Sequence, residues 1–222
     1  MGADDTAVRL NALLVAAGMT PLEDETASRF GHYLSLFLRW RARLSLSSVR
    51  DEGGILSRHI IESIAAARAL PEGIRTVLDF GSGAGLPGIP IALCRREIQV
   101  TLAESQGKKA AFLQEAVRVL GIGAKVYAGR AERLRETFDC AILRAVDKMP
   151  NAVASAAHLV GSAGCLGLMT TTSDVDSLQR AAGRGFSWPI VKQLPGGTHR
   201  IVVFGFRQGE ELEFTGPGSG LR

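Results

Sequence analysis

Four closely spaced glycines follow an acidic residue in the segment 77–90, which reads VLDFGSGAGLPGIP. The glycines are Gly81, Gly83, Gly85 and Gly88. Glycine has no Cβ and tolerates positive φ, so a ligand could approach this backbone closely. A helix expected from near Pro87 would offer free amide groups to an anionic part of that ligand. No Gly-Lys-Ser or Gly-Lys-Thr follows, which excludes a Walker loop.

This turn is compatible with two cofactors, S-adenosylmethionine and a nicotinamide dinucleotide, because residues 83–88 also match the dinucleotide pattern GxGxxG. Asp79 separates them: a carboxylate at the mouth of the pocket would repel a pyrophosphate but attract the α-ammonium of S-adenosylmethionine. Glu104 ends the run VTLAE and suits hydrogen bonding to both ribose hydroxyls in either case. We therefore expect S-adenosylmethionine as the cofactor, with a nicotinamide-dependent dehydrogenase as the alternative. The residues expected to bind it on these grounds are Asp79, Gly81, Gly83, Gly85 and Glu104.

Strand-like runs alternate with helical segments after residue 74 and would position these residues. The runs are residues 75–80, 98–104, 125–128, 138–143, 166–170 and 201–206. Such alternation predicts a parallel sheet with right-handed crossovers, and ligands bind beyond the carboxyl ends of its strands. Arg144 closes one of these runs and is expected beside the pocket.

Helical spacing of apolar residues marks the first 70 residues. Two amphipathic helices are expected from residue 4 to about 43, separated by residues 18–21, and another from about 54 to 70, before Pro71. Phe30, Tyr33 and Phe37 recur at helical spacing and are predicted to belong to the core rather than to stack on bases. We expect a helical extension over residues 1–73, a catalytic domain over 74–208 and a flexible tail over 209–222.

Composition and charge limit the remaining classes. The 222 residues carry 26 Lys and Arg against 22 Asp and Glu, a modest excess that is compatible with nucleic-acid binding. The three cysteines and four histidines lie far apart in the sequence, so we expect neither a disulfide framework nor a metal site. The low cysteine content also predicts a reducing, cytoplasmic location. Residues 149–173 are uncharged, but their Pro, Asn and Gly content predicts a buried helix, a glycine turn and a buried strand rather than a membrane span.

Four stretches together resemble one enzyme family: LDFGSGAGLPGIPIAL, LAESQGKKAAFL, AGRAERL and FDCAILRAV. They are similar to the bacterial 16S (small-subunit) ribosomal RNA guanine-N7 methyltransferases, also called glucose-inhibited division protein B, over about residues 25–205. The resemblance implies an α/β fold of the class I methyltransferase (Rossmann-like) type, a mostly parallel doubly wound sheet with an N-terminal helical cap. It also implies S-adenosylmethionine-dependent methylation of N7 of a guanine in 16S rRNA, as naked RNA or in an assembling small subunit, by a protein that we expect to be a monomer.

The resemblance also carries over site residues. It implies donor contacts at Gly81, Leu86, Ala131, Glu132 and Arg144, and a basic RNA-binding surface at Lys108, Lys109, Arg130 and Arg144. Leu143 and Thr170 depart from the family, which usually has Ser and Lys at these positions.

The chemistry of the implied reaction is simple, because guanine N7 attacks with a lone pair that carries no proton. No general base is expected, Arg144 is predicted to position the reactants, and Glu132 and Asp147 are candidates to stabilise the transferred positive charge. A small-molecule methyltransferase and a non-catalytic RNA-binding protein remain as alternatives.

Overall fold

The computed structural model describes residues 3–41, 44 and 52–208. Within these residues seven strands form one sheet in the order β3-β2-β1-β4-β5-β7-β6. The strands are β1 (Thr76–Phe80), β2 (Gln99–Glu104), β3 (Lys125–Ala128), β4 (Phe138–Arg144), β5 (Val160–Thr171), β6 (Phe186–Gln193) and β7 (Arg200–Arg207). The first five pair in parallel, whereas β7 lies antiparallel between β5 and β6.

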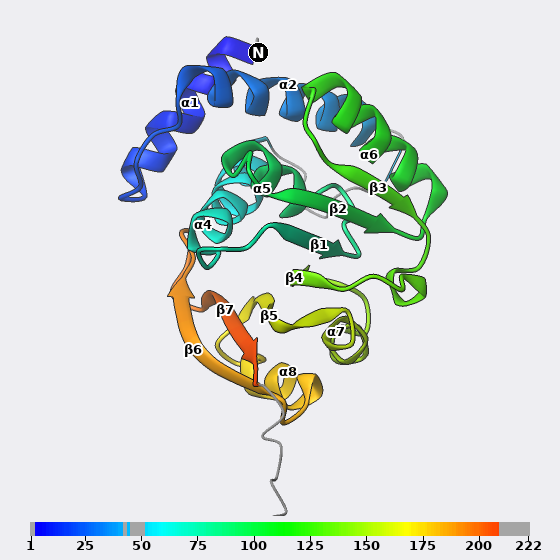
Figure 1. Cartoon of the computed structure of the whole chain (residues 1–222). Coiled ribbons are helices and arrows are strands. Elements are labelled where there is room, and N and C mark those ends of the chain that lie inside the picture. The colour runs from blue at the N-terminus through cyan, green and yellow to red at the C-terminus, as the bar shows by residue number, and fades with distance from the viewer. Residues whose placement is uncertain (1–2, 42–43, 45–51, 209–222) are drawn as a thin grey trace, which may run out of the picture.

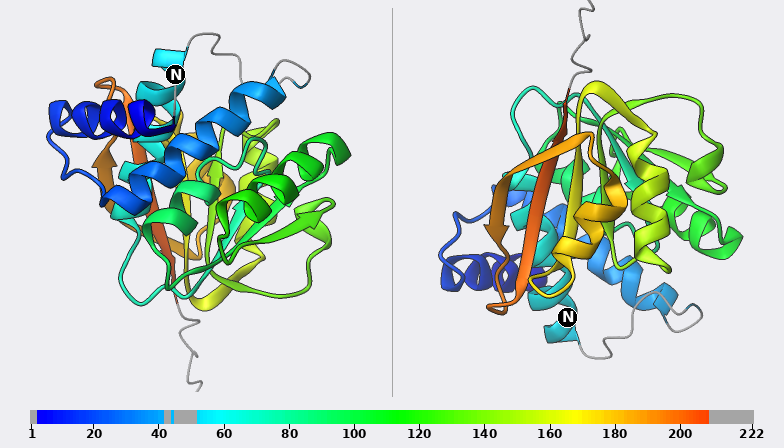
Figure 2. Two further views of the ribbon diagram at one scale, coloured as in Figure 1. Left: turned by 90° about the horizontal axis from the view of Figure 1, so that it is seen from above. Right: turned by 90° about the horizontal axis from the view of Figure 1, so that it is seen from below.

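Helices cover both faces of this sheet (Figure 1). They are α1 (Ala3–Ala16), α2 (Asp24–Arg41), α3 (Glu52–Ile55), the π-helix η1 (Leu56–Ile60), α4 (Ile61–Ala69), α5 (Gly88–Cys94), α6 (Gly107–Leu120), the 3-10 helix η2 (Ala131–Arg133), α7 (Met149–Ala157) and α8 (Val175–Ala182). Helices α4, α5 and α6 lie on one face, and α7 and α8 on the other. Helices α1 and α2 form an additional layer on this side, with α2 outside α5 and α6, which the left view of Figure 2 also shows.

The N-terminal helices share their hydrophobic core with the sheet. Leu10 of α1 and Phe37 of α2 belong to the same buried cluster as Phe112 of α6 and Val100 of β2. The rings of Phe37 and Phe112 meet edge to face with their centroids 6.4 Å apart. A second buried cluster lies between the sheet and the pair α7 and α8. The helical extension is therefore packed as part of the domain and has no separate core of its own within the described residues.

The predicted alternation of strands and helices is confirmed, as is the core position of Phe30, Tyr33 and Phe37, each at most 1% exposed. The segment 54–70 is helical, but its middle turn is the π-helix η1. The predicted glycine turn within residues 149–173 is wrong, because Gly161 and Gly164 lie inside β5. Strand β6 and helix α8 were not predicted. The predicted tail, residues 209–222, lies outside the described residues.

Candidate functional site

The glycine-rich segment forms a tight turn between β1 and α5, at the carboxyl edge of the parallel strands. Gly81, Gly83 and Gly85 have φ of +71°, +58° and +88°, a conformation that side chains disfavour. A Cβ on Gly85 would overlap the side chain of Ile89, whereas a Cβ on Gly83 would meet nothing closer than the Gly81 carbonyl oxygen, at 3.8 Å. Gly83 is thus the position at which the backbone of this turn is open to a ligand.

Asp79 lies beneath this turn rather than at its mouth, so the predicted placement at the entrance is wrong. The side chain is 1% exposed, and its Oδ2 accepts hydrogen bonds from the Ser82 hydroxyl at 2.5 Å and the Gly88 amide at 3.0 Å. Burial raises the pKa of Asp79 to about 6, although both hydrogen bonds oppose this rise. Asp79 therefore fixes the two ends of the turn to each other.

The expectation of free amides at the start of the helix after the turn is also wrong. Gly88 donates to Asp79, and Ile89 donates to the carbonyl of Gly85 at 2.7 Å. Gly88 itself is required by packing, since a Cβ there would overlap Leu102 and approach Oδ2 of Asp79 to 2.6 Å. The last predicted residue of the turn, Leu86, is half-buried.

Glu104 holds the turn from the neighbouring strand. Its Oε2 accepts the amide hydrogen of Gly83 at 2.9 Å, and its Oε1 accepts that of Gln106 at 2.7 Å. The side chain is 6% exposed. An ionised carboxylate has about four acceptor positions, so these two bonds leave capacity for the ribose hydroxyls that the sequence predicts as partners.

Tyr33 is a contact that sequence reasoning missed. This residue of α2 is fully buried, and its hydroxyl donates to the carbonyl oxygen of Ala84 at 2.6 Å. Ala84 lies in the middle of the glycine turn, so the outer helical layer reaches the turn directly. Helical spacing predicts that Tyr33 is buried, but no local pattern could reveal a partner 51 residues away.

Arg144 ends β4, and its guanidinium faces the segment η1–α4. It forms an ion pair with Glu62 at 2.9 Å and lies 2.9 Å from Nδ1 of His59. It also donates to the carbonyl of Arg58 at 2.9 Å and the hydroxyl of Ser63 at 3.2 Å. Because a guanidinium only donates, Nδ1 of His59 must accept. Burial and the charge of Arg144 lower the pKa of His59 to about 4, so this imidazole is neutral near pH 7.

Glu62 joins Arg144 to a second arginine. The Glu62 side chain is fully buried, and its Oε1 lies 2.6 Å from Nε of Arg200 at the start of β7. That approach is ionic, because the two atoms are not aligned as a hydrogen bond. Burial raises the pKa of Glu62, while Arg144 and Arg200 oppose the rise. Sequence reasoning singled out Arg144 but neither of its charged neighbours.

The segment after β4 is strained and packs against the glycine turn. Ala145 and Lys148 both have φ of +50°, which for non-glycine residues is uncommon and costs of order 1 kcal/mol each. Val146, which lies between these two residues in the sequence, is close to Gly81: a Cβ added to Gly81 would be 3.1 Å from Cγ2 of Val146. Such strain often accompanies functional sites, and here it adjoins the predicted cofactor turn.

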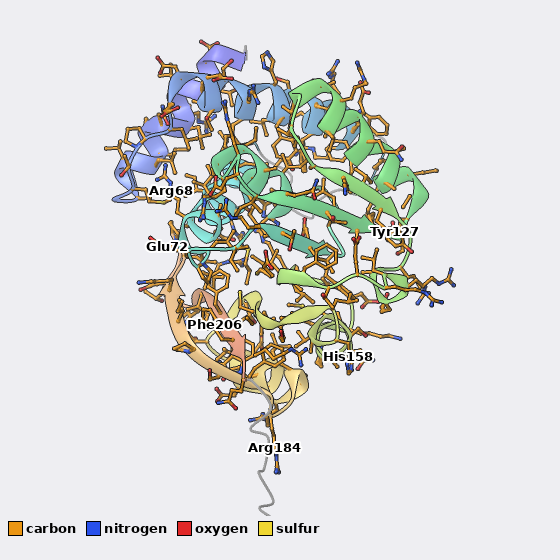
Figure 3. The ribbon with its side chains drawn as sticks, in the orientation of Figure 1. Arg68, Glu72, Tyr127, His158, Arg184 and Phe206 are labelled. Atoms are coloured by element: carbon orange, nitrogen blue, oxygen red, sulfur yellow. The ribbon has the colours of Figure 1, made fainter. Side chains whose placement is uncertain are left out.

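The remaining predicted site residues lie around the same edge. Ala131 is buried and Glu132 is exposed in η2, which follows β3. Tyr127, labelled in Figure 3, precedes them on β3, and its ring packs against Gly129. Among the predicted RNA-binding residues, Lys108 at the start of α6 and Arg130 before η2 are exposed, and Lys109 is half-buried.

The two departures from the family pattern lie on the central strands. Leu143 is fully buried in the cluster beneath α7, and Thr170 is half-buried near the end of β5. Leucine at position 143 therefore serves as a core residue.

A cavity of about 440 Å³ lies elsewhere, between α8 and β6. Its walls include Arg180, Arg184, Phe186 and Trp188, and none of its lining residues is a predicted site residue. Figure 3 shows Arg184 at the α8 end of the molecule, far from Tyr127.

No described helix is long and apolar enough to cross a membrane. In the described part of the chain no group of three or more His, Cys, Asp or Glu is arranged to hold a metal.

The chain is similar to known methyltransferases in sequence and in fold. Residues 26–186 match the family model described as rRNA small subunit methyltransferase G. A ribosomal RNA small subunit methyltransferase G from Xanthomonas campestris pv. campestris is 36% identical over 189 residues, covering 82% of this chain and 88% of that protein. One from Stenotrophomonas maltophilia is 42% identical over 137 residues, covering 60% of this chain and 64% of that protein.

Solved structures give the fold. A methyltransferase from Pyrococcus furiosus superposes with a TM-score of 0.59 at 13% identity, covering 82% of this chain and 99% of that one. An O-methyltransferase from Bacillus cereus in complex with SAH superposes with a TM-score of 0.55 at 16% identity, covering 80% of this chain and 91% of that one.

Proposed function

The chain belongs to the rRNA small subunit methyltransferase G family, and from this premise we propose that it transfers the methyl group of S-adenosylmethionine to N7 of a guanine in small-subunit (16S) rRNA. The observation that carries the proposal is the turn at Gly81–Gly85, which is open at Gly83 and held between the buried carboxylates of Asp79 and Glu104. A pyrophosphate would be repelled by these two acids, whereas a cationic sulfonium nucleoside is attracted.

The residues of the turn fit S-adenosylmethionine, which when bound supplies the methyl group as an electrophile. Glu104 accepts hydrogen bonds from the ribose hydroxyls, and the Gly83 backbone allows close approach. Asp79 acts from below, by its negative charge and by fixing Ser82 to Gly88. Leu86, Ala131 and Glu132 complete the wall around the donor.

The arrangement suits a reaction that needs placement rather than proton transfer. Guanine N7 presents an unprotonated lone pair, and holding two reactants in line supplies roughly 7–11 kcal/mol of the barrier reduction. His59 already accepts a hydrogen bond from Arg144, so no role as a base is assigned to it. Arg144 acts as a positioning residue that fixes the segment η1–α4 at the end of β4.

Cations at the rim of the site would bind the RNA backbone. Lys108, Lys109 and Arg130 come from the elements after β2 and β3, whose carboxyl ends flank the turn. Arginine and lysine contacts to phosphate position a nucleic acid without reading its sequence. We further expect a monomer that works in the cytoplasm, where small subunits assemble; light scattering after size exclusion tests the first point.

The test is methyl transfer in vitro. Purified protein is incubated with labelled S-adenosylmethionine and either 16S rRNA or small subunits from a strain that lacks the activity, and the digested nucleosides are separated. Label in 7-methylguanosine supports the proposal. Label only in a small molecule, or binding of NAD without S-adenosylhomocysteine, would favour the alternative enzymes. RNA binding that depends on salt, without any donor affinity, would indicate a non-catalytic protein.

A further inference from the structure

The hydroxyl of Tyr33 is an external anchor on the cofactor turn. It donates to the Ala84 carbonyl at 2.6 Å, and Ala84 is flanked by Gly83 and Gly85, both with positive φ. The ring comes from α2, in the layer outside α5 and α6 (Figure 1). A residue of the N-terminal helices thus contacts the middle of the turn, whereas Asp79 and Glu104 hold it from the sheet.

The position of this hydroxyl is firmly fixed. Tyr33 is 0% exposed, and its ring meets Phe37 edge to face, with centroids 6.4 Å apart. Phe37 in turn packs against Phe112 of α6. Burial raises the pKa of Tyr33 far above its usual value, so the hydroxyl keeps its proton and remains a donor near neutral pH.

The bond matters because the turn is otherwise permissive. Three glycines with positive φ give this backbone many accessible conformations, and a preorganised one binds its ligand more tightly. Ala84 is 5% exposed, so its carbonyl would be left without a partner in a nearly dry environment if the hydroxyl were removed. Each of the three anchors fixes a different part of the turn: Asp79 its ends, Glu104 the Gly83 amide, and Tyr33 the Ala84 carbonyl.

We propose that Tyr33 is a positioning residue for the methyl donor: its hydroxyl holds Ala84, and with it the neighbouring Gly83 backbone, in the conformation to which S-adenosylmethionine binds. The inference rests on the proposed function, since it assigns the turn to that donor. It makes the N-terminal helical layer part of the donor site. It also implies that loss of the Tyr33 hydroxyl weakens binding of the donor but not binding of RNA.

The experiment removes one atom. Tyr33→Phe keeps the ring and its packing but cannot donate to Ala84. Calorimetry with S-adenosylhomocysteine is expected to show a dissociation constant raised about tenfold, as the loss of a buried hydrogen bond implies. In turnover the KM for S-adenosylmethionine rises by the same factor, while the KM for RNA and the kcat at saturating donor stay close to wild type.

Phe30→Leu is the matched control on the same helix. Phe30 is equally buried but has no polar atom to offer the turn, so its truncation lowers stability without changing donor affinity. Both variants are measured well below their unfolding midpoints. Amide hydrogen exchange gives a second readout, since Gly83 to Leu86 are expected to exchange faster in Tyr33→Phe alone.

Two outcomes would overturn the inference. One is an unchanged dissociation constant and unchanged exchange in Tyr33→Phe. The other is an equal loss of affinity in Phe30→Leu, which would mean that only general packing matters. If the wild type itself bound no S-adenosylhomocysteine, the proposed function would fail as well, and that result is distinguishable from the first two.

Discussion

Glu62 is the residue whose neutralisation gives the sharpest stability test. Its carboxylate is fully buried and faces two guanidinium groups, Arg144 at 2.9 Å and Arg200 at 2.6 Å. Glu62→Gln preserves the shape and one acceptor oxygen but removes the charge. Arg144, whose side chain is 7% exposed, is then left without its counter-ion, whereas Arg200 at 36% remains partly hydrated.

The expected loss of stability is large. Removing one partner of a buried ion pair costs about 3–5 kcal/mol, because a charge remains uncompensated in the interior. For a domain of this size that corresponds to a fall in the melting temperature of roughly 6–20 °C. It is also a considerable part of the roughly 5–15 kcal/mol by which native proteins are stable. Urea unfolding followed by circular dichroism measures the change.

Glu25 provides a matched control, since it also contacts two arginines, Arg29 at 2.8 Å and Arg96 at 3.0 Å. Its side chain is 59% exposed, so water replaces the lost partner, and Glu25→Gln is expected to unfold close to wild type. The reasoning would be refuted if both variants unfolded alike, or if Glu62→Gln lost less than about 1 kcal/mol.

Three further predictions concern the site. Gly83→Asp is expected to abolish binding of S-adenosylhomocysteine in calorimetry, because a side chain and a charge intrude where Gly83 is open. The control Gly73→Asp changes another positive-φ glycine with open space around it and should bind normally; an equal loss of affinity in both variants would contradict this prediction. Donor affinity is expected to rise with pH through about 6, where Asp79 ionises, and Asp79→Asn should flatten this dependence of affinity on pH. The same raised pKa means that the contribution of Asp79 to stability falls as the pH rises from about 4 to about 6. Arg144→Ala is expected to lower turnover about a hundredfold through misplacement of the site. It should also destabilise the fold, because the buried carboxylate of Glu62 keeps the partly exposed Arg200 but loses the buried Arg144. An unchanged kcat would remove the positioning role of Arg144.

The sequence predicts well what depends on local pattern. β-Branched runs bounded by helices place β1 to β4 to within a residue or two, and helical spacing places α1 and α2. Strand β6 was missed because it lies at the sheet edge, contains Pro189 and is largely exposed, so it lacks the buried run that identifies a central strand.

The glycine turn was predictable from the sequence, but its contacts were not. Glycine spacing identifies the turn, since positive φ is a local property of the chain. The bonds from Tyr33 to Ala84 and from Arg144 to Glu62 join residues 51 and 82 positions apart, and only the packing of the N-terminal helices brings them together. The buried position of Asp79 has a different origin: its pairing with Gly88, nine residues away, depends on how α5 folds back over β1.

A crystal structure with S-adenosylhomocysteine tests the central claim most directly. The account predicts the nucleoside against the turn at Gly81–Gly85, with the ribose hydroxyls on Glu104 and the backbone of Gly83 in contact with the ligand. A ligand bound elsewhere, for example between α8 and β6, or a turn that stays empty at saturating concentration, would contradict it.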